Sequence, residues 1–179
     1  MASPKLDVKR FRDVLGHFAT GVAVVTARGT DGAPIGVTMS SFNSVSLQPP
    51  LVLFSVDRRS RSLAAMSQAR GYGINILARE QETLSGRFAT AHTDKWDAVE
   101  HASGYAQAPL LAGALAHFEC RPYAQYDGGD HVIFVVEVLN VATPAVDGEP
   151  LVFFRGHYRS LAPGTSGIAP DQWPLPIHY

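Results

Sequence analysis

The feature that most constrains the fold is a pair of long strand-like segments on either side of one short turn. Segments 114–126 and 131–142 are rich in apolar and aromatic residues, and the sequence DGGD, residues 127–130, lies between them. Aspartate and glycine favour the backbone angles of hairpin turns. The sequence therefore predicts a long antiparallel hairpin.

Most of the other predicted elements are also joined by turns. Further strands are predicted over 21–28, 33–39, 51–56, 71–77 and 151–154, and helices over 5–19, 60–68 and 79–88. Segment 92–113 has weak periodicity, which predicts an irregular crossover. This pattern favours a mainly β fold with flanking helices, whose antiparallel sheet is closed or nearly closed into a barrel. It disfavours a doubly wound parallel sheet, which needs regular alternation of strands and helices.

Composition and charge exclude several classes of protein. The net charge is −1 and the pI is near 6.6, which argues against binding nucleic acid or an anionic membrane through a basic face. Cys120 is the single cysteine, so an internal disulfide and a cysteine zinc cluster are excluded. The sequence shows no signal-peptide pattern and no apolar run of membrane-spanning length. We expect a cytoplasmic protein.

The sequence lacks the common motifs of enzymes that bind nucleotides or metals. It has no G-x-G-x-x-G, no Walker A loop, no G-x-S-x-G elbow and no H-E-x-x-H. Its seven histidines are scattered, without a pair at metal-ligand spacing. If the protein is an enzyme, we expect an organic cofactor and no metal to supply the difficult chemistry.

A run of small polar residues, IGVTMSSFNSVS over 35–46, lies just before the apolar strand at 51–56. An exposed strand face can have the same composition. Gly36, however, allows a close approach to the backbone, and small side chains keep a strand thin. Such a strand, with N–H and hydroxyl donors, suits a flat heterocycle such as a flavin ring.

The segment DRRSRS, residues 57–62, lies in a loop that enters a predicted helix. The first turn of a helix binds phosphate readily, Ser60 and Ser62 would add hydroxyl donors, and Arg59 or Arg61 would neutralise the charge. The alternative is a solvated basic loop with a helix cap.

A third segment, SGRFA over 85–89, lies near the end of another predicted helix. Arg87 is either a surface residue or a second phosphate ligand. Phe88 alone is more typical of a core residue than of a cofactor contact.

The order of these segments resembles the short-chain flavin reductases, which have an FMN-binding split-barrel fold and serve two-component flavin monooxygenases. The resemblance covers about residues 11–161 and rests on FATGVAVVTA, GVTMSSFNSVSLQPPLVLFSV, DRRSRS, INIL, LSGRFA, GGDHVIFVVEV and PLVFFRGHYRSL. It implies a six-stranded antiparallel split β-barrel that acts as a homodimer. It also implies that NADH or NADPH reduces FMN or FAD, and that the reduced flavin leaves for a separate monooxygenase.

The resemblance implies a set of site residues. Thr38, Met39, Ser40 and Ser41 would line the flavin ring, and Val56, Asp57, Ser60 and Ser62 would follow its ribityl chain and phosphate. Arg87 and Phe88 match a segment that contacts the ring or phosphate. His157 and Tyr158 would belong to the pocket wall; alternatively, Tyr158 is a packing residue only. His131 would lie near the nicotinamide or the flavin edge, as the one candidate catalytic residue; alternatively it is a turn histidine with Asp130 as its partner.

We expect one flavin-binding domain over 1–162. Residues 163–179 are dense in proline and glycine, which predicts an extended tail. Two other functions stay open: a flavin carrier or sensor without NAD(P)H turnover, and an oxidase that keeps its flavin. The choice between NADH and NADPH also stays open, because Arg28, Arg59 and Arg155 are each a candidate partner for a 2′-phosphate.

Overall fold

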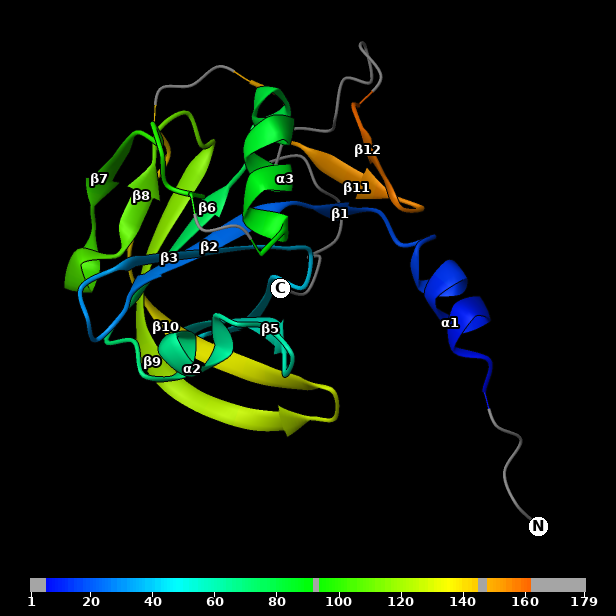
Figure 1. The fold of residues 1–179 in the computed structure, drawn as a ribbon, viewed down its shortest axis with the longest axis horizontal. Helices are drawn as coiled ribbons and strands as arrows, with labels where there is room; N and C mark the ends of the chain where they lie inside the picture. The colour runs from blue at the N-terminus through cyan, green and yellow to red at the C-terminus, as the bar shows by residue number, and fades with distance from the viewer. Residues whose placement is uncertain (1–5, 92–93, 145–147, 162–179) are drawn as a thin grey trace.

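The protein is built around one large antiparallel sheet. The computed structural model describes residues 6–91, 94–144 and 148–161 (Figure 1). The sheet order is β3-β2-β6-β9-β10-β5-β4, and each neighbouring pair is antiparallel. Its strands are β2 (Ala23–Arg28), β3 (Pro34–Met39), β4 (Asn43–Leu47), β5 (Pro50–Asp57), β6 (Tyr72–Ile76), β9 (Ala116–Gly128) and β10 (His131–Ala142). The expectation of a mainly β, antiparallel fold is confirmed.

The sheet curls so far that its two ends nearly meet. Strands β3 and β4 lie at opposite ends of the order, yet only Ser40, Ser41 and Phe42 separate them in the chain. The Ser41 hydroxyl accepts a hydrogen bond from the Ser55 N–H at 2.9 Å and donates to the Ser55 carbonyl at 3.3 Å, which fastens this connection to β5. Strand β4 comes from the polar run and adds a seventh strand to the six that the resemblance implies.

The long hairpin is present as predicted. Strand β10 has the predicted bounds, and β9 lies two residues later in the chain than predicted at each end. Gly129 in the turn has φ +76°, a left-handed conformation that favours glycine. His131 pairs with Gly128 of β9 on one side and with Asp57 of β5 on the other. The turn therefore brings His131 beside the end of β5.

The remaining elements are short. They are α1 (Val8–Leu15), β1 (Thr20–Gly21), α2 (Leu63–Ser67), η1 (Arg79–Gln81), α3 (Glu82–Ala89), β7 (His101–Ser103), η2 (Tyr105–Gln107), β8 (Pro109–Leu111), β11 (Val152–Phe154) and β12 (His157–Arg159). Both α1 and α2 are shorter than predicted. Residues 60–62 form turns before α2, where the Ser60 N–H bonds the Asp57 carbonyl and the Leu63 N–H bonds the Ser60 carbonyl. The predicted crossover contains the small β7–β8 hairpin.

Two apolar clusters lie on the two faces of β2. Inside the curled sheet, Phe54 and Phe134 stack with ring centroids 5.0 Å apart, and Tyr72 meets both rings edge-on. On the other face, Phe88 of α3 packs in a second cluster with Val24. Because α3 is anchored by this second cluster, its last turn is held in place beside β3.

Buried polar side chains fasten the β7–β8 region to the sheet. Asn75 accepts a hydrogen bond from the Leu111 N–H at 2.8 Å, and the Thr26 hydroxyl donates to the Pro109 carbonyl. Both side chains are fully buried. A Cβ atom on Gly73 would lie 2.8 Å from the Pro109 carbonyl oxygen, so only glycine fits there. Polar contacts thus position a segment that has no regular apolar period.

No helix in the described parts of the chain is both long enough and apolar enough to cross a bilayer.

Candidate functional site

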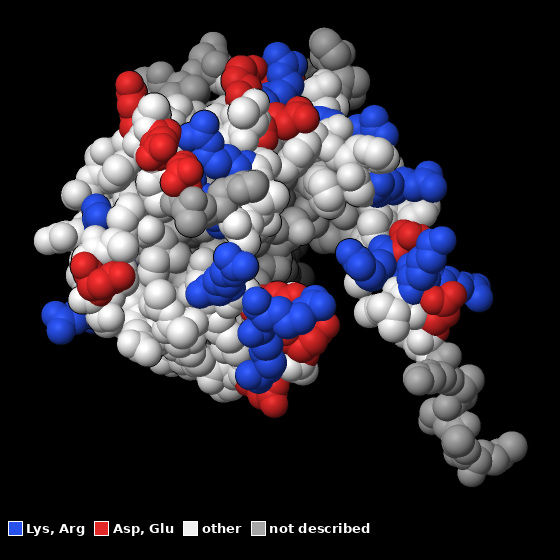
Figure 2. Space-filling model, viewed as in Figure 1, with Lys and Arg blue, Asp and Glu red and all other residues white. Residues whose placement is uncertain are grey.

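One large cleft opens beside β3, with a volume of about 1260 Å³. Five parts of the chain line it: β3 and the connection after it, the end of β5, the loop at 58–62, residues 88–91 with 95–96, and the β9–β10 turn with His131. Figure 2 shows basic and acidic side chains gathered beside a hollow, at the place where β5 ends in Figure 1. Single-ligand pockets usually span about 300–1,000 Å³. The cleft therefore has room for a ligand of dinucleotide size.

Ten of the thirteen predicted site residues line this cleft. They are Thr38, Met39, Ser40, Ser41, Val56, Asp57, Ser60, Ser62, Phe88 and His131. They come from segments that are far apart in the sequence, and the curled sheet brings them together.

The other three predicted residues lie outside the cleft lining. Arg87 donates from Nη1 to the Asp97 carbonyl at 2.8 Å. The Tyr158 hydroxyl bonds the Ser85 hydroxyl at 2.7 Å behind the cleft wall, and His157 is exposed in β12. The structure does not bring these three together with the rest of the predicted site.

The hydroxyl groups of the polar run are largely occupied within the protein. The Thr38 hydroxyl donates to the Ser85 carbonyl at 2.6 Å, which ties β3 to α3. The Ser41 hydroxyl is bonded to the backbone of Ser55. Because β3 is an end strand, half of its backbone N–H groups have no partner strand. Any donors that β3 offers to a ligand are therefore mainly backbone groups.

Gly36 has a different role from the one predicted. A Cβ atom there would lie 2.5 Å from Cε1 of Phe88 and 3.1 Å from Cζ2 of Trp96. Those two rings lie with centroids 4.8 Å apart, edge to face. The close approach that Gly36 permits is thus made by the protein's own aromatic side chains, which form an apolar wall of the cleft. Sequence reasoning missed Trp96 because its segment has weak periodicity.

The loop after β5 has its charges arranged in pairs. Arg59 bonds Asp57 through two atoms, Nη2 to Oδ2 at 2.7 Å and Nε to Oδ1 at 3.1 Å. These bonds hold the pKa of Asp57 well below its usual value. Arg59 is thereby neutralised within its own loop.

Two other cations line the cleft. Among the ion pairs between described residues, neither Arg61 nor Lys95 has a carboxylate partner. Partial burial lowers the pKa of Lys95, because desolvation disfavours its charged form. A bound anion would stabilise both charges. Sequence reasoning missed Lys95 for the same reason as its neighbour Trp96.

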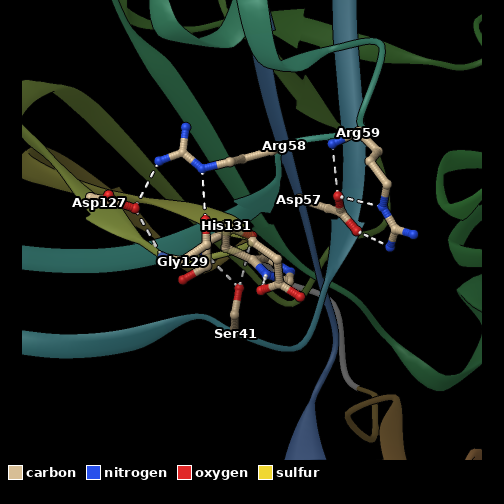
Figure 3. A network of polar contacts seen from close by, with 9 residues as sticks. Ser41, Asp57, Arg58, Arg59, Asp127, Gly129 and His131 are labelled. Atoms are coloured by element: carbon tan, nitrogen blue, oxygen red, sulfur yellow. Dashed lines mark hydrogen bonds and ion pairs between the residues drawn. The ribbon is translucent and has the colours of Figure 1, made fainter. Parts of the chain in front are cut away.

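His131 is oriented by its neighbour in the chain. Its Nδ1 atom lies 2.7 Å from Oδ1 of Asp130 (Figure 3). The pairing engages one ring nitrogen, and His131 lines the cleft. Within the described residues, no group of three or more histidine, cysteine or acidic side chains is placed to hold a metal ion. The residues of this cleft fit an organic anion with a flat ring.

Comparisons with known proteins identify the family. Residues 15–162 match the family described as "Flavin reductase like domain". The chain is 37% identical over 170 residues to the reductase subunit of a flavin-dependent monooxygenase from Rhodococcus jostii, covering 95% of this chain and 86% of that one. It is 45% identical over 150 residues to an FMN reductase (NADH) from Agrobacterium fabrum, covering 84% of each chain.

Solved structures show the same fold. The NADH:FAD oxidoreductase from Streptomyces globisporus, in complex with NAD and FAD fragments, superposes with a TM-score of 0.82 at 38% identity over 91% of this chain and 99% of that one. A putative oxidoreductase from Sinorhizobium meliloti, with a TM-score of 0.81 at 38% identity over 86% of this chain, is longer, and this chain covers 53% of it.

Proposed function

The chain belongs to the flavin reductase-like family, and from this premise we infer that it is an NAD(P)H-dependent flavin reductase of a two-component monooxygenase system. It reduces FMN or FAD and supplies the reduced flavin to a separate monooxygenase. The observation that carries this conclusion is the cleft of about 1260 Å³, which is lined by ten of the thirteen residues that the resemblance implies for such a site.

Each wall of the cleft has its own task. The segment Thr38–Ser41 forms a thin edge with backbone donors for the flavin ring, and Phe88 covers the apolar side. Ser60 and Ser62 face the same cleft as Arg61 and Lys95, so the phosphate end belongs there. Ser62 precedes α2 without a side-chain capping bond, which leaves its hydroxyl free for a ligand. When bound, flavin supplies the ring that accepts a hydride.

We assign His131 to the binding of the reductant, NADH or NADPH. It stands on the wall formed by the β9–β10 turn, and its contact with Asp130 holds the imidazole in one orientation. We propose that it orients the nicotinamide. Two candidate partners for an NADPH 2′-phosphate are already engaged: Arg28 bonds the Gln107 and Gly32 carbonyls, and Arg59 bonds Asp57. Two relatives are named for NADH. We therefore propose NADH as the preferred reductant.

An anaerobic assay tests the proposed function. Purified protein with an excess of free FMN or FAD should bleach the visible flavin band over many turnovers, faster with NADH than with NADPH. The four combinations of flavin and nucleotide settle both preferences. Flavin that stays bound without turnover would instead support the carrier or the oxidase.

We propose that the enzyme is a homodimer. Helix α1 has no buried residue, and it stands apart from the sheet (Figure 1). Apolar side chains of α1 and of the turn after it are exposed, including Leu15 at 55% and Phe18 at 78%. A second cleft of about 1140 Å³ lies between α1 and the β11–β12 turn, and Ser40 lines both clefts. A second copy seated on α1 would bury this apolar face and close the flavin cleft near Ser40.

Sedimentation tests the dimer. The wild type should sediment as a dimer at micromolar concentration, and the double variant Leu15→Glu with Phe18→Glu should sediment as a monomer, because buried charges without partners disfavour an interface. Arg10→Glu, which also changes charge on α1 but keeps the apolar face, should stay dimeric. A wild type that sediments as a monomer contradicts the proposal.

We also propose that residues 1–162 form one domain, which agrees with the family match over 15–162. The predicted tail at 163–179 lies outside the described residues. Dependence on NAD(P)H supports a cytoplasmic location, which cell fractionation would test by the distribution of the reductase activity.

A further inference from the structure

The three arginines of the loop after β5 do three different things. Arg59 pairs with Asp57, and Arg61 lines the cleft. Arg58 instead points away from the cleft lining to the β9–β10 turn (Figure 3). Its Nε donates to the Gly129 carbonyl and its Nη2 to Oδ1 of Asp127, each at 2.8 Å. Two partners are thus bound by one planar guanidinium.

The turn is bound in two further places. The Arg58 backbone N–H donates to the Asp130 carbonyl at 2.9 Å, and the Gly129 N–H donates to Oδ1 of Asp127 at 2.9 Å. Arg58 therefore bonds the turn through side chain and backbone, and Asp127 closes the turn on itself. We call Arg58 and Asp127, with these four bonds, the clasp.

The clasp matters because it holds the turn that carries His131 into the cleft wall. His131 is the next residue after the turn, and its ring is held by Asp130, whose carbonyl the clasp binds. The two glycines between Asp127 and Asp130 have no side chain to pack, so the polar bonds of the clasp restrain the turn. We propose that Arg58 is a positioning residue that, together with Asp127, fixes the turn and thereby the orientation of the His131 imidazole.

This inference rests on the proposed function only for what His131 does. The clasp itself is on the surface: the side chains of Arg58 and Asp127 are 46% and 79% exposed. Exposed ion pairs contribute little to global stability. The hydrogen bond from Arg58 holds the pKa of Asp127 below its usual value, which agrees with a contact between the two charged groups. Loss of the clasp should therefore disturb the turn locally without unfolding the protein.

The test compares Arg58→Ala with Arg58→Lys and with Arg121→Ala as a matched control. Arg121 also bonds a carboxylate through two nitrogens, on Glu137 of the same hairpin, but far from the turn. We expect Arg58→Ala to speed hydrogen exchange of the Gly129 amide by about 10-fold or more. The same variant should show a mixture of His131 tautomers by nitrogen NMR. Its KM for NADH should rise about 5- to 10-fold, while its flavin Kd should stay within about 2-fold of the wild-type value.

Conservative replacement sharpens the result. Arg58→Lys keeps the charge but cannot bond two partners at once, so it should restore part of the effect. Arg121→Ala should leave all four readouts unchanged.

Two outcomes overturn the proposal. One is a wild-type Gly129 exchange rate with an unchanged His131 tautomer in Arg58→Ala. The other is a loss of flavin affinity as large as the rise in KM, which would make Arg58 a phosphate ligand. If the wild type does not oxidise NADH at all, the proposed function fails, while hydrogen exchange and the tautomer still decide on the clasp.

Discussion

Replacing Lys95 with glutamate should weaken the binding of oxidised FMN or FAD by about 100-fold or more. Lys95 lines the cleft, lacks a carboxylate partner among described residues, and is partly desolvated. A phosphate beside it would gain a charged hydrogen bond. Glutamate both removes that bond and places a second negative charge near the phosphate, where partial burial reduces screening by solvent.

Equilibrium titration of flavin fluorescence gives the flavin Kd of the wild type and of Lys95→Glu. Lys95→Met keeps the aliphatic stem and should cost about 10-fold, because it removes the attraction without adding repulsion. Arg70→Glu makes the same change of charge at an exposed position outside the cleft lining and should leave Kd unchanged. Wild-type affinity in Lys95→Glu would show that the phosphate binds elsewhere.

Replacing Phe134 with alanine should destabilise the protein by about 3–5 kcal/mol, because it leaves a cavity in the aromatic cluster inside the curled sheet. Phe134 is 1% exposed. It stacks on Phe54 at 5.0 Å and 7°, and it meets the Tyr72 ring edge-on at 6.2 Å. Its strand, β10, pairs with both β9 and β5, so the loss falls at the centre of the sheet.

Urea unfolding at equilibrium measures this cost. Phe134→Leu refills much of the cavity and should cost about 1–2 kcal/mol. A loss below about 1 kcal/mol in Phe134→Ala would contradict the central place of this aromatic cluster.

The fold was predictable where local pattern and tertiary pairing agree. The long hairpin carried both a strand pattern and a turn that needs glycine, and it was predicted almost to the residue. Strand β4 was not predicted, because its run of serines and asparagine is equally typical of a loop. Its alternating burial is visible only in the structure. It becomes a strand by pairing with β5, while the adjoining Ser41 bonds Ser55. Strands β7, β8 and β12 span three residues each, too few for a period to show.

The site was predictable only in part, for a related reason. Asp57 and His131 could be predicted because they lie at the ends of clearly patterned strands, within the segments that carry the resemblance. Lys95 and Trp96 lie in a segment with weak period, and its place beside β3 follows from the packing of Phe88 against Gly36. The sequence does not indicate that Arg58 bonds the β9–β10 turn while Arg61 lines the cleft, since both arginines lie in one short basic loop.

The connection between β3 and β4 has only three residues. The end of the cleft beside it should therefore tolerate changes in segment length less well than the end beside the loop at 58–62. The connection works as a short tether across the seam of the curled sheet, so an insertion there would widen the whole sheet. The loop at 58–62 and the described residues 90–91 and 94–96 lie outside the sheet, so the loop at 58–62 can change length without moving a strand. Insertions and deletions that suit a longer or shorter flavin should therefore occur at the proposed phosphate end. The width of the cleft at the proposed ring end should stay constant.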